Sequence, residues 1–340
     1  MKIAIDVMSG DNGLEAAIPA VGLVLSKYNN LEITLVGIAS QIQQSLKKHN
    51  IHHESIRIVN ASEVVKMTDS PIQALRYKKD SSMRKAIDLL KQGEVDACVS
   101  AGNTGALMAT SKFVLNTING IDRPAIASTI PTFKGQTLLL DLGANVQCSA
   151  LNLHQFALMG SILSRYTNNN GSGEQKPRVA LLNVGKEDYK GNDLVKATSE
   201  LLSKNDQLNY IGYIEGDDLY YGVAEVVVCD GFVGNIVLKT SEGVARFISD
   251  IIKQEYNKNI FTKLLGFLSN PVIGSIRNKL DSRKYNGASF LGLNGVVIKS
   301  HGGADAYAFA NAIIKAKNEV EFNIIEKLKE QSDAFLSSEK

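Results

Sequence analysis

The stretch Ser100-Ala101-Gly102-Asn103-Thr104-Gly105-Ala106 joins an apolar, β-rich run at Val95–Val99 to a helix-like run at Leu107–Leu115. The order strand, Gly-rich turn, helix is the basic unit of an α/β fold. Glycines let the backbone approach a ligand closely, and the start of a helix offers free N–H groups and the positive end of its dipole. The turn therefore predicts a site for phosphate or another anion. The alternative is an ordinary βα turn capped by Asn103 or Thr104.

The same turn differs from two common nucleotide motifs. No Lys-Ser/Thr pair follows the glycines, as it does in a Walker loop, and the spacing is not the G-x-G-x-x-G of dinucleotide-binding folds. The absence of that fingerprint argues against a nucleotide-dependent dehydrogenase.

Strand-like and helix-like runs alternate on both sides of this turn. They begin Lys2–Val7, Leu14–Tyr28, Glu32–Gly37, Ala39–Lys48 and Ser55–Asn60, and they end with a strand at Gly292–Ser300 and a helix at Tyr307–Leu328. Such alternation predicts a parallel sheet with helices on both faces. We expect an α/β fold with a mostly parallel, Rossmann-like, three-layer sheet. A polar, Gly-rich run at 168–176 is the predicted surface loop between two halves.

Several other predicted strands also end in Gly-rich polar turns. These turns are Met8–Gly13, the Asp141–Asn145 segment, Asp230–Asn235 and His301–Asp305. Ligands of open α/β sheets bind at the carboxyl ends of strands. We therefore expect these turns to converge at one edge of the sheet and to form a small-molecule site.

The composition is that of an ordinary soluble globular protein. The chain has 340 residues, 44% of them apolar, and a net charge of +2, which argues against a general nucleic-acid-binding protein. No run of about 20 apolar residues exists, so we expect no membrane span. Cys98, Cys148 and Cys229 form no C-x-x-C pair and predict reduced core residues in a cytosolic protein.

Residues 246–285 break the alternating pattern. Apolar residues recur at helical spacing around Phe261, Leu264 and Leu268, Pro271 interrupts them, and six Lys or Arg face one Asp between 257 and 284. We predict an amphipathic helical hairpin inserted in a core formed by residues 1–245 and 286–330, with a frayed tail at 331–340. An apolar stripe with a cationic face suits an anionic membrane or an acidic protein partner. The alternative is a hairpin packed on the core or across a dimer interface.

The order of these segments resembles the phosphate acyltransferases of bacterial phospholipid synthesis, the PlsX family. The resemblance runs from Met1 to about Leu328. It rests on Met8–Asp11, Val99–Met108, Asp141–Asn145, Asn183–Gly185, Ile214–Leu219, Val228–Asn235 and Leu291–Asp305. One departure is Ser9, where the family usually has glycine, so that a hydroxyl is added near the site.

The resemblance implies transfer of a long-chain acyl group from acyl carrier protein to inorganic phosphate. The acyl phosphate is then used by a membrane glycerol-3-phosphate acyltransferase in phospholipid synthesis. It also implies a cytosolic homodimer that contacts the membrane peripherally, a fold similar to that of the phosphotransacetylases, and neither a cofactor nor a metal. The basic and apolar hairpin residues are then candidates for membrane or carrier-protein contact: Lys258, Phe261, Lys263, Leu264, Leu268 and Arg277.

Within that reaction, the strand-end turns receive roles by hypothesis. We expect the catalytic side chains to be Asn103, Lys299, His301 and Asp230. We expect substrate or phosphate to be bound by Ser100, Gly102, Thr104, Gly105, Asp11, Asn145, Gly231 and Asn235. The alternatives are structural: His301 caps the turn that follows it, and Asp11, Asp141 and Asp230 cap theirs.

Two rival functions stay open at this point. The first is a phosphotransacylase that uses short acyl-CoA, and the second is a membrane-adsorbed scaffold without catalysis. The predicted polar turns argue against the scaffold, and the long amphipathic hairpin argues for a large, acidic, lipid-bearing acyl donor.

Overall fold

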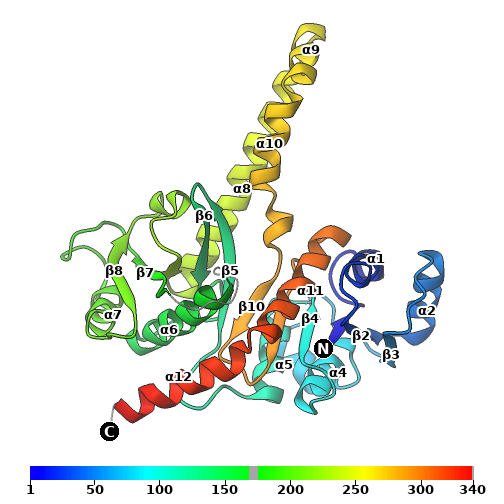
Figure 1. The fold of residues 1–340 in the computed structure, drawn as a ribbon, viewed down its shortest axis with the longest axis horizontal. Helices are drawn as coiled ribbons and strands as arrows, with labels where there is room; N and C mark the ends of the chain where they lie inside the picture. Colours follow the sequence, from blue (N-terminus) through cyan, green and yellow to red (C-terminus); the bar gives the residue numbers. More distant parts are fainter. Residues whose placement is uncertain (168–174, 339–340) are drawn as a thin grey trace.

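The computed structural model describes residues 1–167 and 175–338, apart from the side chains of residues 277, 280 and 333–338. The predicted surface loop at 168–176 therefore lies almost wholly outside the described residues. The ribbon shows two lobes side by side, with a long helical projection that rises between them (Figure 1).

One sheet of eleven strands runs through both lobes, in the order β3-β2-β1-β4-β11-β10-β5-β6-β9-β7-β8. Seven strand pairs are parallel and three are antiparallel, so the prediction of a mostly parallel sheet is confirmed. The strands are β1 (Lys2–Asp6), β2 (Glu32–Gly37), β3 (Ile56–Asn60), β4 (Ala97–Ser100), β5 (Ala125–Thr132), β6 (Gly135–Leu140), β7 (Arg178–Leu182), β8 (Asn209–Ile214), β9 (Val226–Val228), β10 (Ala288–Leu291) and β11 (Val296–Lys299).

The two parallel halves of the sheet run in opposite directions. β10 is antiparallel to both β11 and β5, and β5 is antiparallel to β6. Three reversals lie between β11 and β6, so β6, β9, β7 and β8 point opposite to β3, β2, β1, β4 and β11. The expectation that all strand-end turns meet at one edge of the sheet is therefore wrong. β10, which the sequence pattern did not predict, leaves β11 and β5 pointing the same way, and the antiparallel β5–β6 pair then gives the net reversal.

Helices cover both faces of the sheet, as predicted. In β4 the side chain of Cys98 joins one buried apolar cluster, while Ala97 and Val99 join another on the opposite face. This alternation is the two-residue period of a strand buried on both sides. The helices of the lobes are α1 (Gly13–Leu25), α2 (Ala39–Lys48), α3 (Pro71–Tyr77), α4 (Ser82–Lys91), α5 (Thr104–Leu115), α6 (Ala150–Thr167), α7 (Asp193–Ser203), α11 (Ala306–Glu321) and α12 (Ile324–Ser338), with short 3₁₀ turns at Asp218–Tyr221 and Ser282–Tyr285.

The projection consists of α8 (Gly231–Tyr256), α9 (Ile260–Leu268) and α10 (Asn270–Leu280). The predicted break at Pro271 is confirmed, because this residue lies in the first turn of α10. The predicted boundary at residue 246 falls inside the unbroken α8, which begins at the sheet and continues into the projection. The core and the hairpin therefore share one helix.

Two predictions near the carboxyl terminus need correction. The strand predicted at Gly292–Ser300 starts only at Val296, because Gly292 has a φ of 90° in the turn after β10. The helix predicted at Tyr307–Leu328 breaks at Asn323, which has a φ of 50°. The second helix, α12, then continues to Ser338, beyond the start of the frayed tail predicted at residue 331.

Candidate active site

Three strand-end turns from adjacent strands β1, β4 and β11 contact one another. Asp11 N–H donates to the Gly302 carbonyl at 2.9 Å, and Ser300 N–H donates to the Ser100 carbonyl at 2.9 Å. Gly10 lies between the other two turns with a φ of 84°, and an added Cβ there would stand 2.8 Å from Ala101 Cβ. The turns at 8–13, 100–105 and 301–305 therefore form one compact site, as the sequence predicted for this half of the sheet.

A buried carboxylate, Asp6, lies beneath these turns. Its Oδ2 accepts hydrogen bonds from the hydroxyl groups of Ser9 and Ser100, the latter at 2.7 Å. Ser100 Oγ in turn accepts the Gly102 N–H at 3.1 Å. Burial raises the pKa of Asp6 above its ordinary value, although the surrounding hydroxyl groups of Ser82, Ser9 and Ser100 oppose that shift. The added hydroxyl of Ser9 is therefore near the site, as expected, but it is 3% exposed and bonded to Asp6.

The turn at Ser100–Gly105 has the free donors of a helix start. The N-cap residue is Asn103, whose Oδ1 accepts the Ala106 N–H at 2.9 Å. Within the described chain, the backbone N–H groups of Asn103, Thr104 and Gly105 make no hydrogen bond, and Thr104 and Gly105 are exposed. Three N–H groups at the positive end of α5 form an anion-binding arrangement.

The side chain of Asn103 also ties this turn to a neighbouring loop. Its Nδ2 donates to the carbonyls of Met67 at 2.7 Å and Asp69 at 3.4 Å. Both amide hydrogens are therefore directed at the backbone of the loop that precedes α3. These contacts favour a positioning role for Asn103, and its role as a donor to the reacting oxygen stays a prediction.

Lys299, the last residue of β11, supplies a buried positive charge to the same site. It is 8% exposed, and its Nζ donates to the carbonyl of Ala101 at 3.1 Å and also to that of Ser300. Desolvation lowers the pKa of Lys299 to about 8, against the opposing effect of the nearby Asp11 carboxylate. At neutral pH the ammonium is thus mostly charged and lies directly behind the Gly-rich turn.

The imidazole of His301 follows Lys299 at the site. Its Nδ1 accepts the Gly303 N–H at 3.1 Å, so the neutral ring carries its proton on Nε2. Desolvation lowers the pKa of His301, which keeps the ring neutral at pH 7. The predicted structural role as a cap of the Gly302–Gly303 turn is confirmed by this bond, and it leaves Nε2–H available as a donor.

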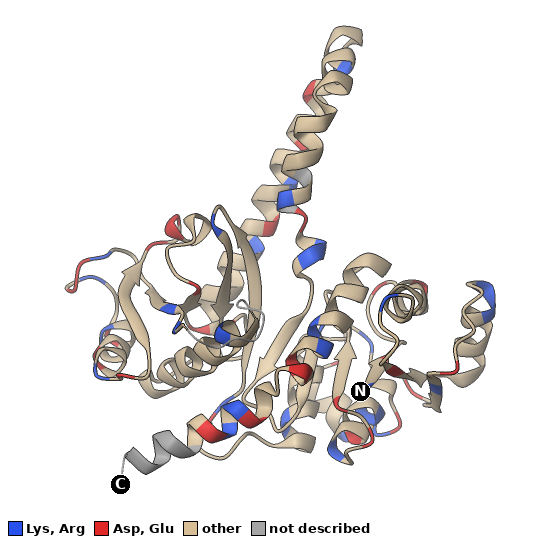
Figure 2. Ribbon diagram, in the orientation of Figure 1, with Lys and Arg blue, Asp and Glu red and all other residues tan. Residues whose placement is uncertain are grey.

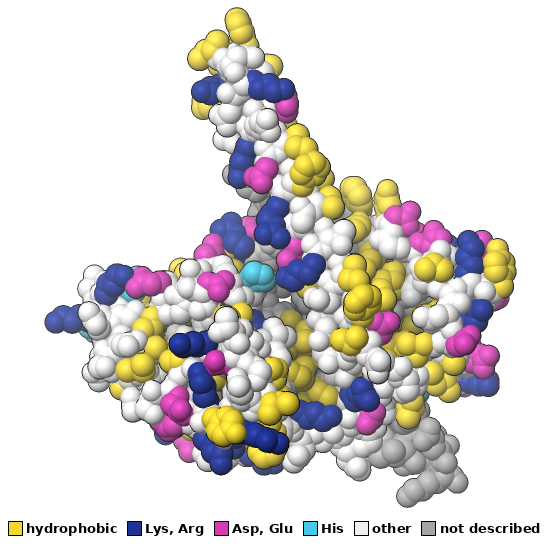
Figure 3. All heavy atoms as spheres, turned by 180° about the vertical axis from the view of Figure 1, so that it is seen from behind, with side chains coloured by type: hydrophobic (Ala, Val, Ile, Leu, Met, Phe, Trp, Pro, Cys, Tyr) yellow, Lys and Arg dark blue, Asp and Glu magenta, His cyan; other side chains and the backbone are white. Residues whose placement is uncertain are grey.

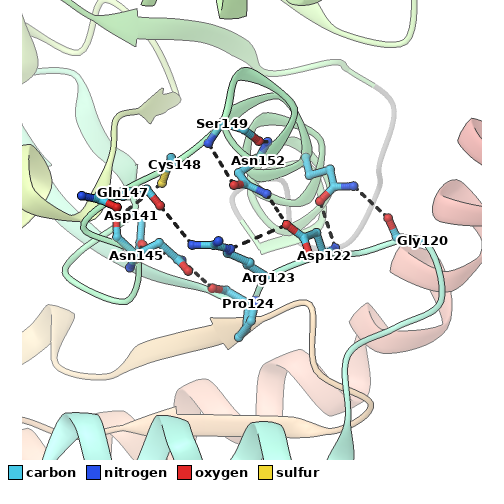
Figure 4. Close-up of polar contacts among 11 residues, drawn as sticks. Gly120, Asp122, Arg123, Pro124, Asp141, Asn145, Gln147, Cys148, Ser149 and Asn152 are labelled. Atoms are coloured by element: carbon cyan, nitrogen blue, oxygen red, sulfur yellow. Dashed lines mark hydrogen bonds and ion pairs between the residues drawn. The ribbon is translucent and has the colours of Figure 1, made fainter. Parts of the chain in front are cut away.

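The other predicted residues lie in the second half of the sheet, around Asp141. This buried carboxylate accepts hydrogen bonds from the N–H groups of Ile126 and Ala144 and from both the N–H and Nδ2 of Asn145. Asn145 Nδ2 also donates to the Pro124 carbonyl at 2.8 Å (Figure 4). Burial raises the pKa of Asp141. Asp141 and Asn145 therefore shape their own loop, and no donor hydrogen of the Asn145 amide is left for a ligand.

The loop at Asp141–Asn145 packs against the start of α8. Gly231 N–H donates to the Asn145 carbonyl at 2.8 Å, and the Asp230 carboxylate accepts the Val233 N–H at 2.9 Å. Asp230 is thus the N-cap of α8, which confirms the structural alternative for this residue. Asn235 is exposed on α8 beside Gly143.

Helix α8 connects the two groups of predicted residues. Its N-cap, Asp230, lies in one lobe, and in the other lobe the charge of Glu242 raises and that of Lys239 lowers the pKa of His301. Lys239 also opposes the protonation of Lys299. Nine residues of helix separate Asp230 from Lys239, about 14 Å along the axis. The two groups are therefore separate clusters, and α8 spans the distance between them.

Sequence reasoning missed Asp6 and Lys239. Asp6 is a carboxylate at the end of an apolar strand, directly before a Gly-rich turn, and that position is a signal that a search for polar strand ends can use. Lys239 gives no such signal, because a lysine inside a long amphipathic helix has the same appearance as any solvated surface residue.

The cysteines are not nucleophiles of this site. All three are free thiols; Cys98 and Cys229 are buried, which raises the pKa of each, and burial raises the pKa of Cys148 to about 11. Their predicted place in or beside the core is confirmed. In the described part of the chain, no three His, Cys, Asp or Glu side chains gather as a metal site, and no helix has the length and apolar character needed to cross a membrane.

The hairpin residues predicted to contact a membrane or carrier protein are exposed. Phe261 is 76% exposed, Leu264 57% and Leu268 66%, and none of the described residues of α9 is buried. The alternative that the hairpin packs on the core is therefore wrong. Lys263 is also exposed, Lys258 pairs with Glu255 at 2.6 Å, and the side chain of Arg277 lies outside the described residues.

Comparison with known proteins identifies the family of this chain. A sequence model for the family described as fatty acid synthesis protein matches residues 1–327. The phosphate acyltransferase of Alkalilimnicola ehrlichii is 50% identical over 339 residues, covering 99% of this chain and 98% of its own length. That of Legionella pneumophila (strain Paris) is 49% identical over 338 residues, with the same coverage.

Among solved structures, a phosphotransacetylase from Streptococcus pyogenes superposes with a TM-score of 0.63 at 16% identity, over 94% of each chain. This similarity supports the predicted phosphotransacetylase-like fold. The sequence matches extend over nearly the whole length of this chain and of its relatives. The chain is therefore an acyltransferase and belongs to the phosphate acyltransferase family.

Proposed function

We propose that this protein transfers a long-chain fatty acyl group from acyl carrier protein to inorganic phosphate. The product is an acyl phosphate that serves phospholipid synthesis. The observation that carries the proposal is that one Gly-rich turn has the buried Lys299 ammonium bonded to its Ala101 carbonyl and the free N–H groups of Thr104 and Gly105 at the start of α5. This combination suits a small, doubly charged anion such as phosphate.

The reaction needs an oriented phosphate more than it needs a strong base. A phosphate oxygen attacks the thioester carbonyl carbon, a C–O bond forms, and the C–S bond breaks to release the thiolate, which takes up a proton. Phosphate is already partly dianionic at neutral pH, and a thiolate leaves readily. Positioning and electrostatic stabilisation therefore account for most of the lowering of the barrier.

The residues of the site divide these tasks. The N–H groups of Thr104 and Gly105 bind phosphate, Lys299 balances its charge from behind the turn, and the Ser100 hydroxyl, held by Asp6, fixes the shape of the turn. Nε2–H of His301 donates to the carbonyl oxygen or to the departing sulfur. In this assignment Asp230 and Asn145 position α8, and Gly231 and Asn235 border the substrate.

The test follows free thiol released from palmitoyl acyl carrier protein, with and without phosphate, and identifies the acyl product by mass spectrometry. Phosphate-dependent release together with palmitoyl phosphate is the expected result. Release of free palmitate alone, or no release from a folded sample, contradicts the proposal.

We also propose that the hairpin of α8–α10 contacts the membrane peripherally, where an integral glycerol-3-phosphate acyltransferase would receive the product. Hydrophobic side chains cover the end of the projection and continue down one side (Figure 3). Charged residues of both signs lie along it (Figure 2). An exposed apolar surface of this extent marks a site of contact with lipid or with another protein. We propose that a homodimer covers part of the surface along α8 and α10, and that lipid covers the tip at α9.

Two alternatives differ from this proposal in their acyl donor or in catalysis. A short-chain phosphotransacylase would use acetyl-CoA or butyryl-CoA at least as well as palmitoyl acyl carrier protein. A scaffold would bind vesicles without turnover. The exposed apolar projection favours the large lipid-bearing donor over short acyl-CoA, and the buried lysine behind an open anion site favours catalysis over the scaffold.

A further inference from the structure

A cavity of about 570 Å³ lies in the second lobe, at the carboxyl ends of β7 and β9. Its apolar lining comes from three helices and two strand ends. These residues are Leu153 of α6, Val195 of α7, Val233 of α8, and Leu182 and Val228 at the ends of β7 and β9. Its volume falls within the range of about 300–1,000 Å³ that is typical of ligand sites. None of the residues given a catalytic role above, except the helix cap Asp230, lines it.

The polar side chains at the edge of the cavity are already bonded within their own turns. Asn183 Nδ2 donates to the Gly185 carbonyl at 3.0 Å, and Asn192 Oδ1 accepts the Val195 N–H at 2.9 Å. Asp230 likewise caps α8 through the Val233 N–H. Among the residues that the structure describes, no cationic side chain lines the cavity. These walls therefore suit an apolar ligand and do not suit an anionic or strongly polar one.

The cavity is lined in part by the first turn of α8, the helix that also passes the candidate active site. Val233 lines the cavity, and Lys239, six residues further along, acts on Lys299 and His301. Six residues of helix span about 9 Å. Val184, which also lines the cavity, is 77% exposed, so the cavity is open to solvent on that side. One extended molecule can thus have a reacting end near His301 and an apolar end in the cavity.

We propose that this cavity binds the hydrocarbon chain of the acyl substrate and sets the preferred chain length. The proposal rests on the acyl transfer proposed above, which places the thioester carbonyl beside Thr104 and His301. At about 30 Å³ for each methylene, the share of one water molecule in the liquid, the cavity has capacity for roughly 15 to 20 carbons, which is ample room for the far end of a long chain whose carbonyl lies beside His301. A chain too short to reach far into the cavity leaves its apolar wall uncovered, which lowers the transition-state affinity for short substrates.

Two substitutions fill the cavity from different sides. Val195→Phe adds a ring from α7. Gly216→Leu adds a side chain where an added Cβ meets no other atom within 4 Å and where φ is not positive, so the backbone tolerates it. Leu201→Phe is the matched control, because Leu201 lies on the same helix as Val195 but does not line the cavity.

The measurement is kcat/KM for octanoyl and palmitoyl acyl carrier protein with saturating phosphate, in the wild type and the three variants. Removing room for one methylene changes discrimination by about tenfold or more. We expect the palmitoyl-to-octanoyl ratio to fall at least about tenfold in Val195→Phe and Gly216→Leu, with octanoyl transfer retained, and to stay constant in Leu201→Phe. An unchanged ratio in both filled variants, or an equal loss with both donors, overturns the assignment.

Binding of dodecanoate and octanoate, measured by calorimetry, separates this proposal from the proposed reaction. If the wild type binds dodecanoate more tightly and Gly216→Leu removes that preference, the cavity is a hydrocarbon site even where no acyl phosphate is formed. If acyl phosphate is formed but Gly216→Leu changes neither the chain-length ratio nor the binding, the cavity assignment alone is wrong.

Discussion

The hydroxyl of Ser100 donates a 2.7 Å hydrogen bond to Oδ2 of Asp6, and through this bond a fully buried carboxylate fixes the Gly-rich turn after β4. Asp6 and Ser100 are paired residues of neighbouring parallel strands. The same oxygen accepts the hydroxyl of Ser9 from the turn after β1. One carboxylate thus holds two of the three turns that form the candidate phosphate site.

The first prediction concerns the titration of Asp6. Burial raises the pKa of Asp6 above the ordinary 3.8. Protonation of Asp6 therefore contributes to the free energy of unfolding in full below pH 3.8, and this contribution is lost as the pH rises through the folded-state pKa. Asn at this position does not titrate. We expect the stability of Asp6→Asn relative to the wild type to improve between pH 4 and pH 8, which thermal unfolding at several pH values measures. A difference that is the same at every pH contradicts the shift, and the exposed Asp206→Asn is the control.

The second prediction concerns Lys299 and phosphate. Desolvation lowers its pKa to about 8, so the positive charge behind the Gly-rich turn is present below pH 8 and is lost as the pH rises through that value. We expect the KM for phosphate to rise above pH 8. A hydrogen bond to a charged group contributes about 1.5–3 kcal/mol, so Lys299→Met should raise this KM by about 10- to 100-fold and flatten its pH dependence. Steady-state kinetics between pH 6.5 and 9 test both statements. A rise above pH 8 that persists in Lys299→Met assigns it to another group.

The Lys299 site shows which features could be predicted from the sequence and which could not. Strand, turn and helix at Val95–Leu115 were predictable because the apolar period, the glycines and the cap residue all agree locally. The sequence also places Lys299 and His301 at a strand end. Burial of the ammonium against the Ala101 carbonyl depends on the pairing of β11 with β4, which are nearly 200 residues apart. Local patterns carry no information about such a pairing.

The place of β10 in the sheet could not be predicted from the sequence for a related reason. β10 has four residues and its partners are β11 and β5, so its direction is set by tertiary contacts and not by its own pattern. The amide of Asn103 is another example. Its cap role follows from sequence, whereas its bonds to Met67 and Asp69 depend on where a loop 34 residues earlier packs.

The third prediction separates the two roles of Asn103. Asn103→Ala removes the cap and should cost about 1 kcal/mol of stability, with a higher KM for phosphate. Asn103→Asp keeps an oxygen that accepts the Ala106 N–H, but it adds a negative charge beside the anion site and removes the donor to Met67. We expect near-normal unfolding and weakened phosphate binding in Asn103→Asp. Unfolding by denaturant and phosphate kinetics give the two readouts. Unchanged phosphate kinetics in both variants remove this turn from the phosphate site.

The fourth prediction concerns His301 as a donor. General acid assistance typically contributes about 10²–10⁴-fold, and a good thiolate leaving group places the expected effect at the lower end, about 10²-fold in kcat. We expect His301→Ala to lower kcat with little change in the KM for phosphate. If His301 only caps the Gly302–Gly303 turn through Nδ1, the variant loses stability instead and its kcat, measured below its unfolding temperature, is unchanged.

The last prediction concerns the tip of the hairpin. Leu264 and Leu268 are 57% and 66% exposed on the same face of α9, where a lipid surface or a second subunit would cover them. Burial of one leucine side chain contributes about 1.5–3 kcal/mol, so the double variant Leu264→Ser with Leu268→Ser should bind anionic vesicles at least about 100-fold more weakly. Leu23→Ser, an equally exposed leucine on α1, is the control. Vesicle sedimentation and analytical ultracentrifugation are measured on the same samples. Loss of vesicle binding with an unchanged oligomeric state supports lipid contact, whereas dissociation into monomers with vesicle binding retained assigns this face to the subunit interface.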